Sequence, residues 1–122
     1  MTELFANQAQ TTITSGGTTA PAGGTSESWT PASGSGFPVA DPTAFPPTYF
    51  RITDIAASSE KIIVTDSRSS PWTVTRGAEG TTPVAHTSGF TVQNVITAGA
   101  MGDAAQWSDL SVATLAQRMF CV

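Results

Sequence analysis

Alternating apolar and polar side chains mark four segments of this chain as β-strands. In residues 72–75 (WTVT) apolar side chains alternate with threonine, and residues 90–93 (FTVQ) repeat the pattern. Period-two alternation is typical of a strand with one buried face. Residues 49–55 (YFRITDI) and 61–66 (KIIVTD) show it as well. These segments predict a four-strand antiparallel meander whose apolar face must be covered by a crossover, a helix or a neighbouring subunit.

Two shorter strands are expected before the meander. Threonine and isoleucine in residues 11–14 favour a pleated surface. Residues 28–30 predict a second short strand, which Pro31 ends or confines to an edge. Glycine pairs and proline make residues 15–26 a loop, and residues 56–60 fit a hairpin connection.

Two further segments are predicted to be irregular. Residues 37–47 contain four prolines and are expected to form an extended crossover, with Phe37, Val39 and Phe45 covering the core. A proline-rich ligand for another protein is the alternative. Residues 76–89 form a loop too long for a tight hairpin, and loops of this length are usually functional or disordered. Its three glycines favour an ordered, tightly turned loop pressed against the rest of the protein.

The pattern changes to a helical one near the C-terminus. Apolar residues recur at the spacing of one helical face, and Ser108 and Asp109 could cap such a helix. A helix this short must dock, either on its own sheet or on another subunit. The apolar positions, with Trp107 as an anchor just before them, are Val112, Leu115, Ala116, Met119 and Phe120.

The predicted fold is therefore mainly β. It is a small antiparallel β-sandwich or meander with extended Pro/Gly-rich loops and a short C-terminal helix. We divide the chain into an N-terminal arm and loop (1–27), a β domain (28–101) and a C-terminal helical tail (102–122).

Composition and charge argue against several classes of function for this protein. Lys and Arg total 5 against 9 Asp and Glu, a net charge of −4. With no basic cluster, nucleic-acid binding is not expected. No segment approaches the roughly 20 apolar residues of a membrane span, and the N-terminus lacks a signal-peptide pattern. The single cysteine, Cys121, allows no internal disulfide. It is expected to be a small apolar residue of a docked tail, or to form an intermolecular disulfide.

The chain offers little catalytic chemistry. His86 is the only histidine and Ser88 follows it closely, but no nucleophile motif accompanies them. A hydrolase using His86 ranks last among the candidate functions, and its ring is expected to bond backbone groups of the loop. No catalytic residue, cofactor or metal site is predicted.

The charged residues of the meander are explained by ion pairing or by solvation. Arg76 and Glu79 could form an ion pair with each other, which at a surface contributes ~0–1 kcal/mol to stability. Alternatively, they could form ion pairs across a subunit boundary. Asp54, Glu60 and Asp66 are expected to be solvated, because a calcium site needs more closely grouped oxygen ligands.

Aromatic residues suggest an alternative function, a carbohydrate-binding module for host surface glycans. Trp29, Tyr49 and Trp72 would be its stacking platforms. Trp72 alternates with Val74 and is better explained as core, whereas Trp29 beside Pro31 is the better candidate for a surface contact.

The chain also resembles a known family over roughly residues 4–101. An ordered set of segments is similar to a small β module of tailed-bacteriophage structural proteins, found at the start of tail-fibre or minor tail proteins and in short virion accessory proteins. The longest of these segments reads VTRGAEGTTPVAH. The similar segments are residues 4–12, 32–38, 74–86, 89–92 and 97–99.

The resemblance implies a structural protein located in the virion and assembled in the host cytoplasm. Fibre-type relatives imply a homotrimer that also binds other virion proteins, such as major capsid or tail proteins. Fibre proteins of this type continue into a long shaft, whereas this chain stops soon after the module, which favours a capsid-decoration or fibre-adaptor role. The residues proposed for the assembly interface are Leu4, Phe5, Arg76, Glu79, His86, Trp107, Leu115, Met119 and Phe120.

Overall fold

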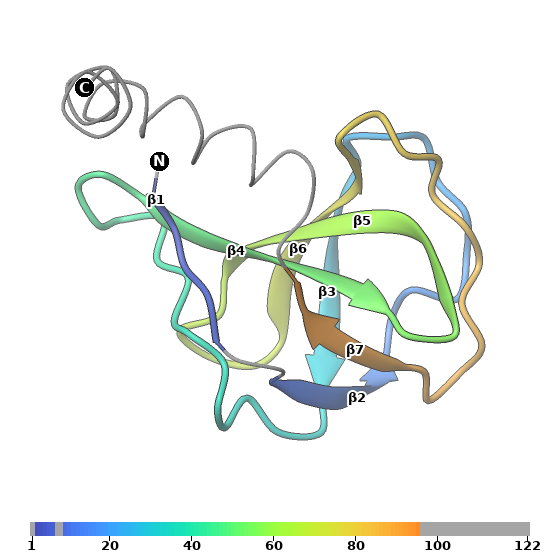
Figure 1. Cartoon of the computed structure of the whole chain (residues 1–122), viewed down its shortest axis with the longest axis horizontal. Coiled ribbons are helices and arrows are strands. Elements are labelled where there is room, and N and C mark those ends of the chain that lie inside the picture. Colours follow the sequence, from blue (N-terminus) through green and yellow to red (C-terminus); the bar gives the residue numbers. More distant parts are fainter. Residues whose placement is uncertain (1, 7–8, 96–122) are drawn as a thin grey trace, which may run out of the picture.

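The computed structural model describes residues 2–6 and 9–95, and all regular structure in these ranges is β (Figure 1). This confirms the mainly β prediction. No helix in the described ranges could span a membrane, and the predicted C-terminal helix lies outside them. The strands are β1 (Thr2–Glu3), β2 (Gln10–Ser15), β3 (Ser26–Pro31), β4 (Thr48–Asp54), β5 (Ala57–Asp66), β6 (Trp72–Ala78) and β7 (Thr91–Asn94).

Six of these strands form a closed antiparallel barrel. Their order is β4-β5-β6-β3-β2-β7, and β7 pairs back onto β4, with Thr53 opposite Gln93. The short β1 pairs in parallel with the start of β4. The predicted sandwich or open meander is therefore corrected to a barrel. Closure gives every barrel strand two neighbours and lets the apolar face cover itself.

Several strand assignments from the sequence hold and others need correction. The β4-β5-β6 meander is confirmed, but the predicted fourth strand, β7, pairs with β4 and β2 rather than with β6. β5 begins at Ala57, so most of the hairpin connection predicted at residues 56–60 is strand. β2 belongs to the barrel although it falls within the predicted arm of residues 1–27.

The barrel interior is filled by aromatic and branched side chains. Phe37 lies against Phe50 and Trp72, with ring centroids 5.7 and 5.1 Å apart. The Phe37–Trp72 pair is edge-to-face, a geometry that adds to the stabilisation from burial. Trp72 is core, as predicted, but Trp29 is fully buried rather than at the surface. The other large core residues are Ile13, Ile52, Ile62, Val64, Val74, Phe90 and Val92.

The proline-rich crossover covers the core with only one of its three predicted residues. Phe37 is buried, but Val39 is 57% and Phe45 102% exposed. The reason is a fixed turn in the backbone. The Ala40 N–H donates to Ser67 Oγ at 2.8 Å, and the Thr48 N–H donates to the Asp41 carbonyl at 3.0 Å. These bonds bring Ala40 inward, and Val39 and Phe45 lie outside.

Two glycines with positive φ provide a test of the packing around Trp29 and Phe90. A Cβ on Gly17 (φ 79°) would lie 2.7 Å from Phe90 Cζ, whereas a Cβ on Gly24 (φ 85°) would meet nothing within 4 Å. Gly24→Ala should cost about 1–2 kcal/mol for its left-handed backbone alone. Gly17→Ala should cost about 1–3 kcal/mol more, because it also overpacks the core. Urea unfolding would measure both, and equal losses would contradict this packing.

Candidate functional site

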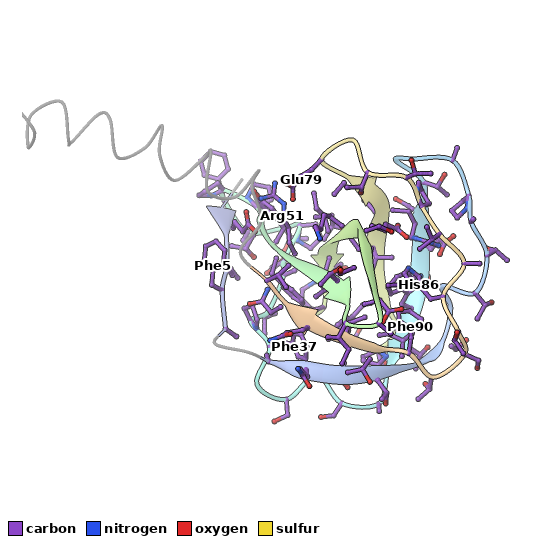
Figure 2. The ribbon with its side chains drawn as sticks, turned by 45° about the vertical axis from the view of Figure 1, so that its right-hand side comes forward. Phe5, Phe37, Arg51, Glu79, His86 and Phe90 are labelled. Carbon is purple, nitrogen blue, oxygen red and sulfur yellow. The ribbon has the colours of Figure 1, made fainter. Side chains whose placement is uncertain are left out.

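One end of the barrel contains five interacting ionisable side chains, which we call the buried ion cluster: Glu27, Asp54, Glu60, Arg76 and His86. They come from β3, β4, β5, β6 and the loop between β6 and β7. Glu60 and Arg76 are fully buried, and Asp54 and His86 nearly so. Glu27 is partly exposed. Figure 2 shows His86 and Phe90 on the side of the barrel away from Arg51 and Glu79.

Strand periodicity places the two central charges inside. In β6 the buried positions alternate through Trp72, Val74, Arg76 and Ala78. In β5 the buried positions continue backwards from Val64 and Ile62 to Glu60. Extending each apolar face by one more period therefore leads to a charged residue. This signal was present in the sequence, but Glu60 was predicted to be solvated.

Arg76 uses every donor of its guanidinium. Nε and Nη2 donate to the two oxygens of Glu60 at 2.7 and 2.9 Å, a bidentate ion pair. Nη1 donates to Glu27 Oε1 and to the Thr19 carbonyl, both at 3.0 Å. Nη2 also donates to the Val84 carbonyl at 2.6 Å. These five bonds account for all five N–H groups of the side chain.

The Glu60 carboxylate is equally occupied. Besides the bonds from Arg76, it accepts from the Gly77 and Val84 N–H groups, each at 3.0 Å. Burial alone would raise the pKa of Glu60, but the bonds from Arg76, Val84 and Gly77 outweigh it and hold the pKa below its ordinary value of 4.5. Burial likewise acts to lower the pKa of Arg76, and the bonds to Glu60 and Glu27 raise it instead. Both groups are therefore held in their charged forms.

His86 has both ring nitrogens engaged by carboxylates. Nδ1 lies 2.8 Å from Asp54 Oδ2 and Nε2 lies 3.0 Å from Glu60 Oε1. The ring stacks on Phe90, with centroids 4.6 Å apart. The predicted backbone partners of the ring are therefore corrected to two carboxylates. A general base needs a nitrogen free to take a proton from a nucleophile, and here neither nitrogen is free.

The cluster holds two long loops against the barrel. The Val84 N–H and carbonyl both bond to it, as does the Thr19 carbonyl. The two loops also bond to each other, because the His86 N–H donates to the Gly17 carbonyl at 2.9 Å. Figure 1 shows the segments joining β2 to β3 and β6 to β7 side by side. The long loop lies against the rest of the protein, as predicted, and hydrogen bonds to charged groups hold it there.

A second group of charges lies on the outer face of β4. Arg51 Nη1 donates to Glu3 Oε1 at 2.6 Å, and Arg51 Nε lies 3.6 Å from Glu79 Oε2. Tyr49 Oη also bonds to Glu3 Oε1, at 3.2 Å. Glu79 adopts φ 58° in the turn after β6. These contacts tie the N-terminal segment to the barrel wall.

The turn between β4 and β5 borders a surface pocket of about 370 Å³, which we call the β4–β5 end pocket. Its apolar wall includes Ile55, which is 51% exposed, and Phe90. Asp54 and His86 of the buried ion cluster lie at its inner side. The described ranges contain no group of His, Cys, Asp and Glu arranged to hold a metal ion.

The structure separates the predicted site residues. Arg76 pairs with Glu60 rather than with Glu79, which faces Arg51 instead. Asp54 and Glu60 are buried partners of His86, so the prediction that they are solvated was wrong. Among the proposed interface residues, Arg76 and His86 are internal, Leu4 packs on the core and Phe5 is half exposed. Trp107, Leu115, Met119 and Phe120 lie outside the described residues.

The three proposed sugar-stacking platforms are not at the surface. Trp29 is 0%, Trp72 3% and Tyr49 7% exposed. The Trp29 ring contacts Phe90 at 5.2 Å and its Nε1 donates to Glu27 at 2.8 Å. These rings are thus committed to the core and to the outer face of β4, which leaves the carbohydrate-binding alternative without its platforms.

A scan of protein-family models, a search of curated proteins and a search of solved structures each find no significant match to this chain.

The buried ion pair between Arg76 and Glu60 provides a stability prediction. In Glu60→Gln or Arg76→Met, one buried charge loses its bidentate ionic partner, so each variant should lose about 3–5 kcal/mol of unfolding free energy. Combining them should cost less than the sum, because the two residues share one interaction. Arg68→Ala is the control, since the Arg68–Asp66 pair is solvent-exposed and should matter little. Urea unfolding would measure all four variants against the unaltered protein. Similar losses from Arg68→Ala and Arg76→Met would refute the assigned importance of burial.

The lowered pKa of Glu60 predicts a loss of stability in acid. The unfolded chain, in which this carboxyl titrates near 4.5, binds more protons than the folded chain. The contribution of Glu60 is therefore fully present above pH 4.5 and is lost as the pH falls through the lower folded pKa. Unfolding free energy measured across this range should decline less steeply in Glu60→Gln than in the unaltered protein. Asp41 and Asp66 also have lowered pKa values, but both proteins contain them. Parallel declines would be evidence against the assignment to Glu60.

Proposed function

We propose that this chain is a structural subunit of a bacteriophage virion, a trimeric decoration or fibre-adaptor subunit on the capsid or tail surface. Its partners are other copies of itself and neighbouring virion proteins. The proposal starts from the resemblance of residues 4–101 to a module of such proteins. It does not depend on any catalytic group.

The observation that carries the proposal is how the chain uses two side chains, Arg76 and His86, of its most characteristic string, residues 74–86. Arg76 and His86 make all their contacts inside the protein, where they fix the loop to the barrel. A string whose distinctive residues maintain architecture is what a structural module requires. An enzyme would instead have to leave a titratable group open to a substrate.

The closed barrel also supports a role in assembly. An open sheet edge invites uncontrolled pairing between copies, and closure of the barrel through β4 and β7 removes such edges. A subunit of this shape can be stored and displayed at high local concentration without edge-to-edge aggregation. Its specific contacts are then made by side chains of the outer wall, the loops and the terminal segments rather than by strand pairing.

A particle inventory tests the proposed function. Quantitative mass spectrometry of purified virions of the phage that encodes this chain should detect it at a fixed copy number, high for a capsid location and low for a tail location. Light scattering of the purified protein should give a mass above that of one chain. A protein that stays monomeric, is absent from virions and fails to bind particles when added back would contradict the proposal.

A further inference from the structure

His86 is held between two acidic side chains that belong to different strands. Its Nδ1 lies 2.8 Å from Asp54 Oδ2, and its Nε2 lies 3.0 Å from Glu60 Oε1. Both are hydrogen-bond distances, and each of the two bonds needs one proton. The ring is only 4% exposed and lies against Phe90 (Figure 2). The positions of these two protons therefore fix the charge at the centre of the buried ion cluster.

The proton on the Glu60 side belongs to the histidine. Burial acts to raise the pKa of Glu60, but hydrogen bonds from Arg76, Val84 and Gly77 hold it below its ordinary value of 4.5. The carboxylate is therefore ionised and has no proton to donate. Its Oε1 accepts from Arg76 Nη2 at 2.9 Å and from the Val84 N–H at 3.0 Å. His86 Nε2 is thus a third donor to this oxygen.

The proton on the Asp54 side belongs to the histidine as well. An aspartic acid ordinarily loses its proton near pH 3.9, and an imidazolium ordinarily does so only near about pH 6.5. Of the two groups that share the proton, the imidazole is therefore the stronger base. With Nδ1 and Nε2 both donating, the ring of His86 carries two protons and a positive charge.

A charged ring also improves the charge balance of the buried ion cluster. The cluster contains three carboxylates, those of Glu27, Asp54 and Glu60, and one guanidinium, that of Arg76. With a neutral histidine, two negative charges lack a cation, and a buried charge without a partner is costly. An imidazolium leaves one in excess. Water can solvate part of that excess, because the Glu27 side chain is 20% exposed.

The other segments around His86 bring no further charge to the ring. Residues 10–15, 16–25 and 91–94 contain no ionisable side chain. The segment between β6 and β7, residues 79–90, has one besides His86, and this residue, Glu79, faces Arg51 instead. Protonation of the ring is therefore governed by Asp54 and Glu60, with the rest of the buried ion cluster behind them.

We propose that the loop of residues 79–90 is a clamp controlled by one proton, closed on the barrel only while His86 is doubly protonated. When the ring gives a proton to solvent, a nitrogen lone pair faces a carboxylate oxygen, so one hydrogen bond is lost and the two atoms repel each other. His86 and its neighbours in residues 85–89 line the β4–β5 end pocket. Release of the ring therefore opens the wall of this pocket.

The direction of the pH dependence follows from proton counting. The closed loop binds one more proton than the released loop, so rising pH favours release and falling pH favours closure. Glu60 sets a limit in acid, because its ionised form is lost as the pH falls through its lowered pKa. The two transitions therefore have opposite directions and can be told apart.

Nuclear magnetic resonance of the full chain tests the clamp, because His86 is the only histidine and isotope-labelled histidine gives signals from this ring alone. While the loop is closed, both ring nitrogens should be protonated. As the pH is raised from about 5, where histidine begins to titrate, the ring signals and the backbone N–H signals of Val84 and His86 should change together. The Leu4 N–H, which donates to the Tyr49 carbonyl, is the internal control and should stay constant.

Asp54→Asn removes the charge that requires the second proton. The amide keeps an oxygen for the Ala56 N–H, which Asp54 Oδ1 accepts at 2.9 Å. Its own N–H can donate to a neutral Nδ1. The loop of this variant should therefore stay closed when the ring is neutral, and its loop signals should no longer follow the ring signals. Asp66→Asn is the matched control, since Asp66 pairs with Arg68 at a solvent-accessible site, and should titrate like the unaltered protein.

A closed loop with a neutral ring in the unaltered protein would overturn the proposal. Loop signals that stay constant while the ring titrates would do the same, as would an Asp54→Asn protein whose loop still follows ring protonation. If Asp54→Asn does not fold, the titration of the unaltered protein decides alone. The proposed function is tested separately, because the composition of purified virions does not depend on the charge of this ring.

Discussion

The bidentate ion pair between Arg76 and Glu60 is the interaction on which the end of the barrel around the buried ion cluster depends. Removing two charges from water costs several kcal/mol per ion, and the attraction between them compensates only when the remaining hydrogen-bonding groups are also satisfied. The structure meets that condition, since Arg76 has all five donors bonded and Glu60 accepts from backbone and His86 as well. The pair is therefore stable only with the surrounding loops in place. Loop order and ion pairing are two aspects of one arrangement.

This dependence explains how a chain so rich in Gly, Pro, Ser and Thr can order its loops. Loops of such composition bury little apolar surface and would ordinarily gain too little to offset their conformational entropy. Here the carbonyls of Thr19 and Val84 accept charge-assisted hydrogen bonds from Arg76, which are stronger than bonds between neutral groups. The stacked pair of His86 and Phe90 then extends the core to the inner wall of the β4–β5 end pocket. A pocket made by loops thus gains a fixed shape.

The sequence predicted the strands well because alternation is a local property. β4 and β6 are each predicted from an alternation between residues a few positions apart, and turn-forming residues mark where the strands end. Barrel closure was not predicted, since the pairing of β7 with β4 joins segments about 40 residues apart and leaves no local trace. The buried ion cluster was missed for a different reason. Arg76 and Glu60 lie on core-facing positions of their strands, but charged residues are almost always exposed, so their residue type argues against the burial that periodicity indicates. Their burial is energetically possible only because the two charges lie close together, and this proximity arises from the tertiary structure.

The position of the buried ion cluster also bears on how the proposed structural subunit can make contacts. In a closed barrel the strand backbones are fully paired, so the parts available to partners are the side chains of the outer wall, the loops at the two ends and the terminal segments. Flexible loops would have to lose entropy at every contact with a partner. The cluster removes that cost at one end by fixing the loops around the β4–β5 end pocket. At the other end, hydrogen bonds among Asp41, Thr43 and Thr48 hold the base of the loop of residues 41–48. Fixing both ends of the barrel suits the proposed structural role, in which a subunit has to present the same surface to each neighbour.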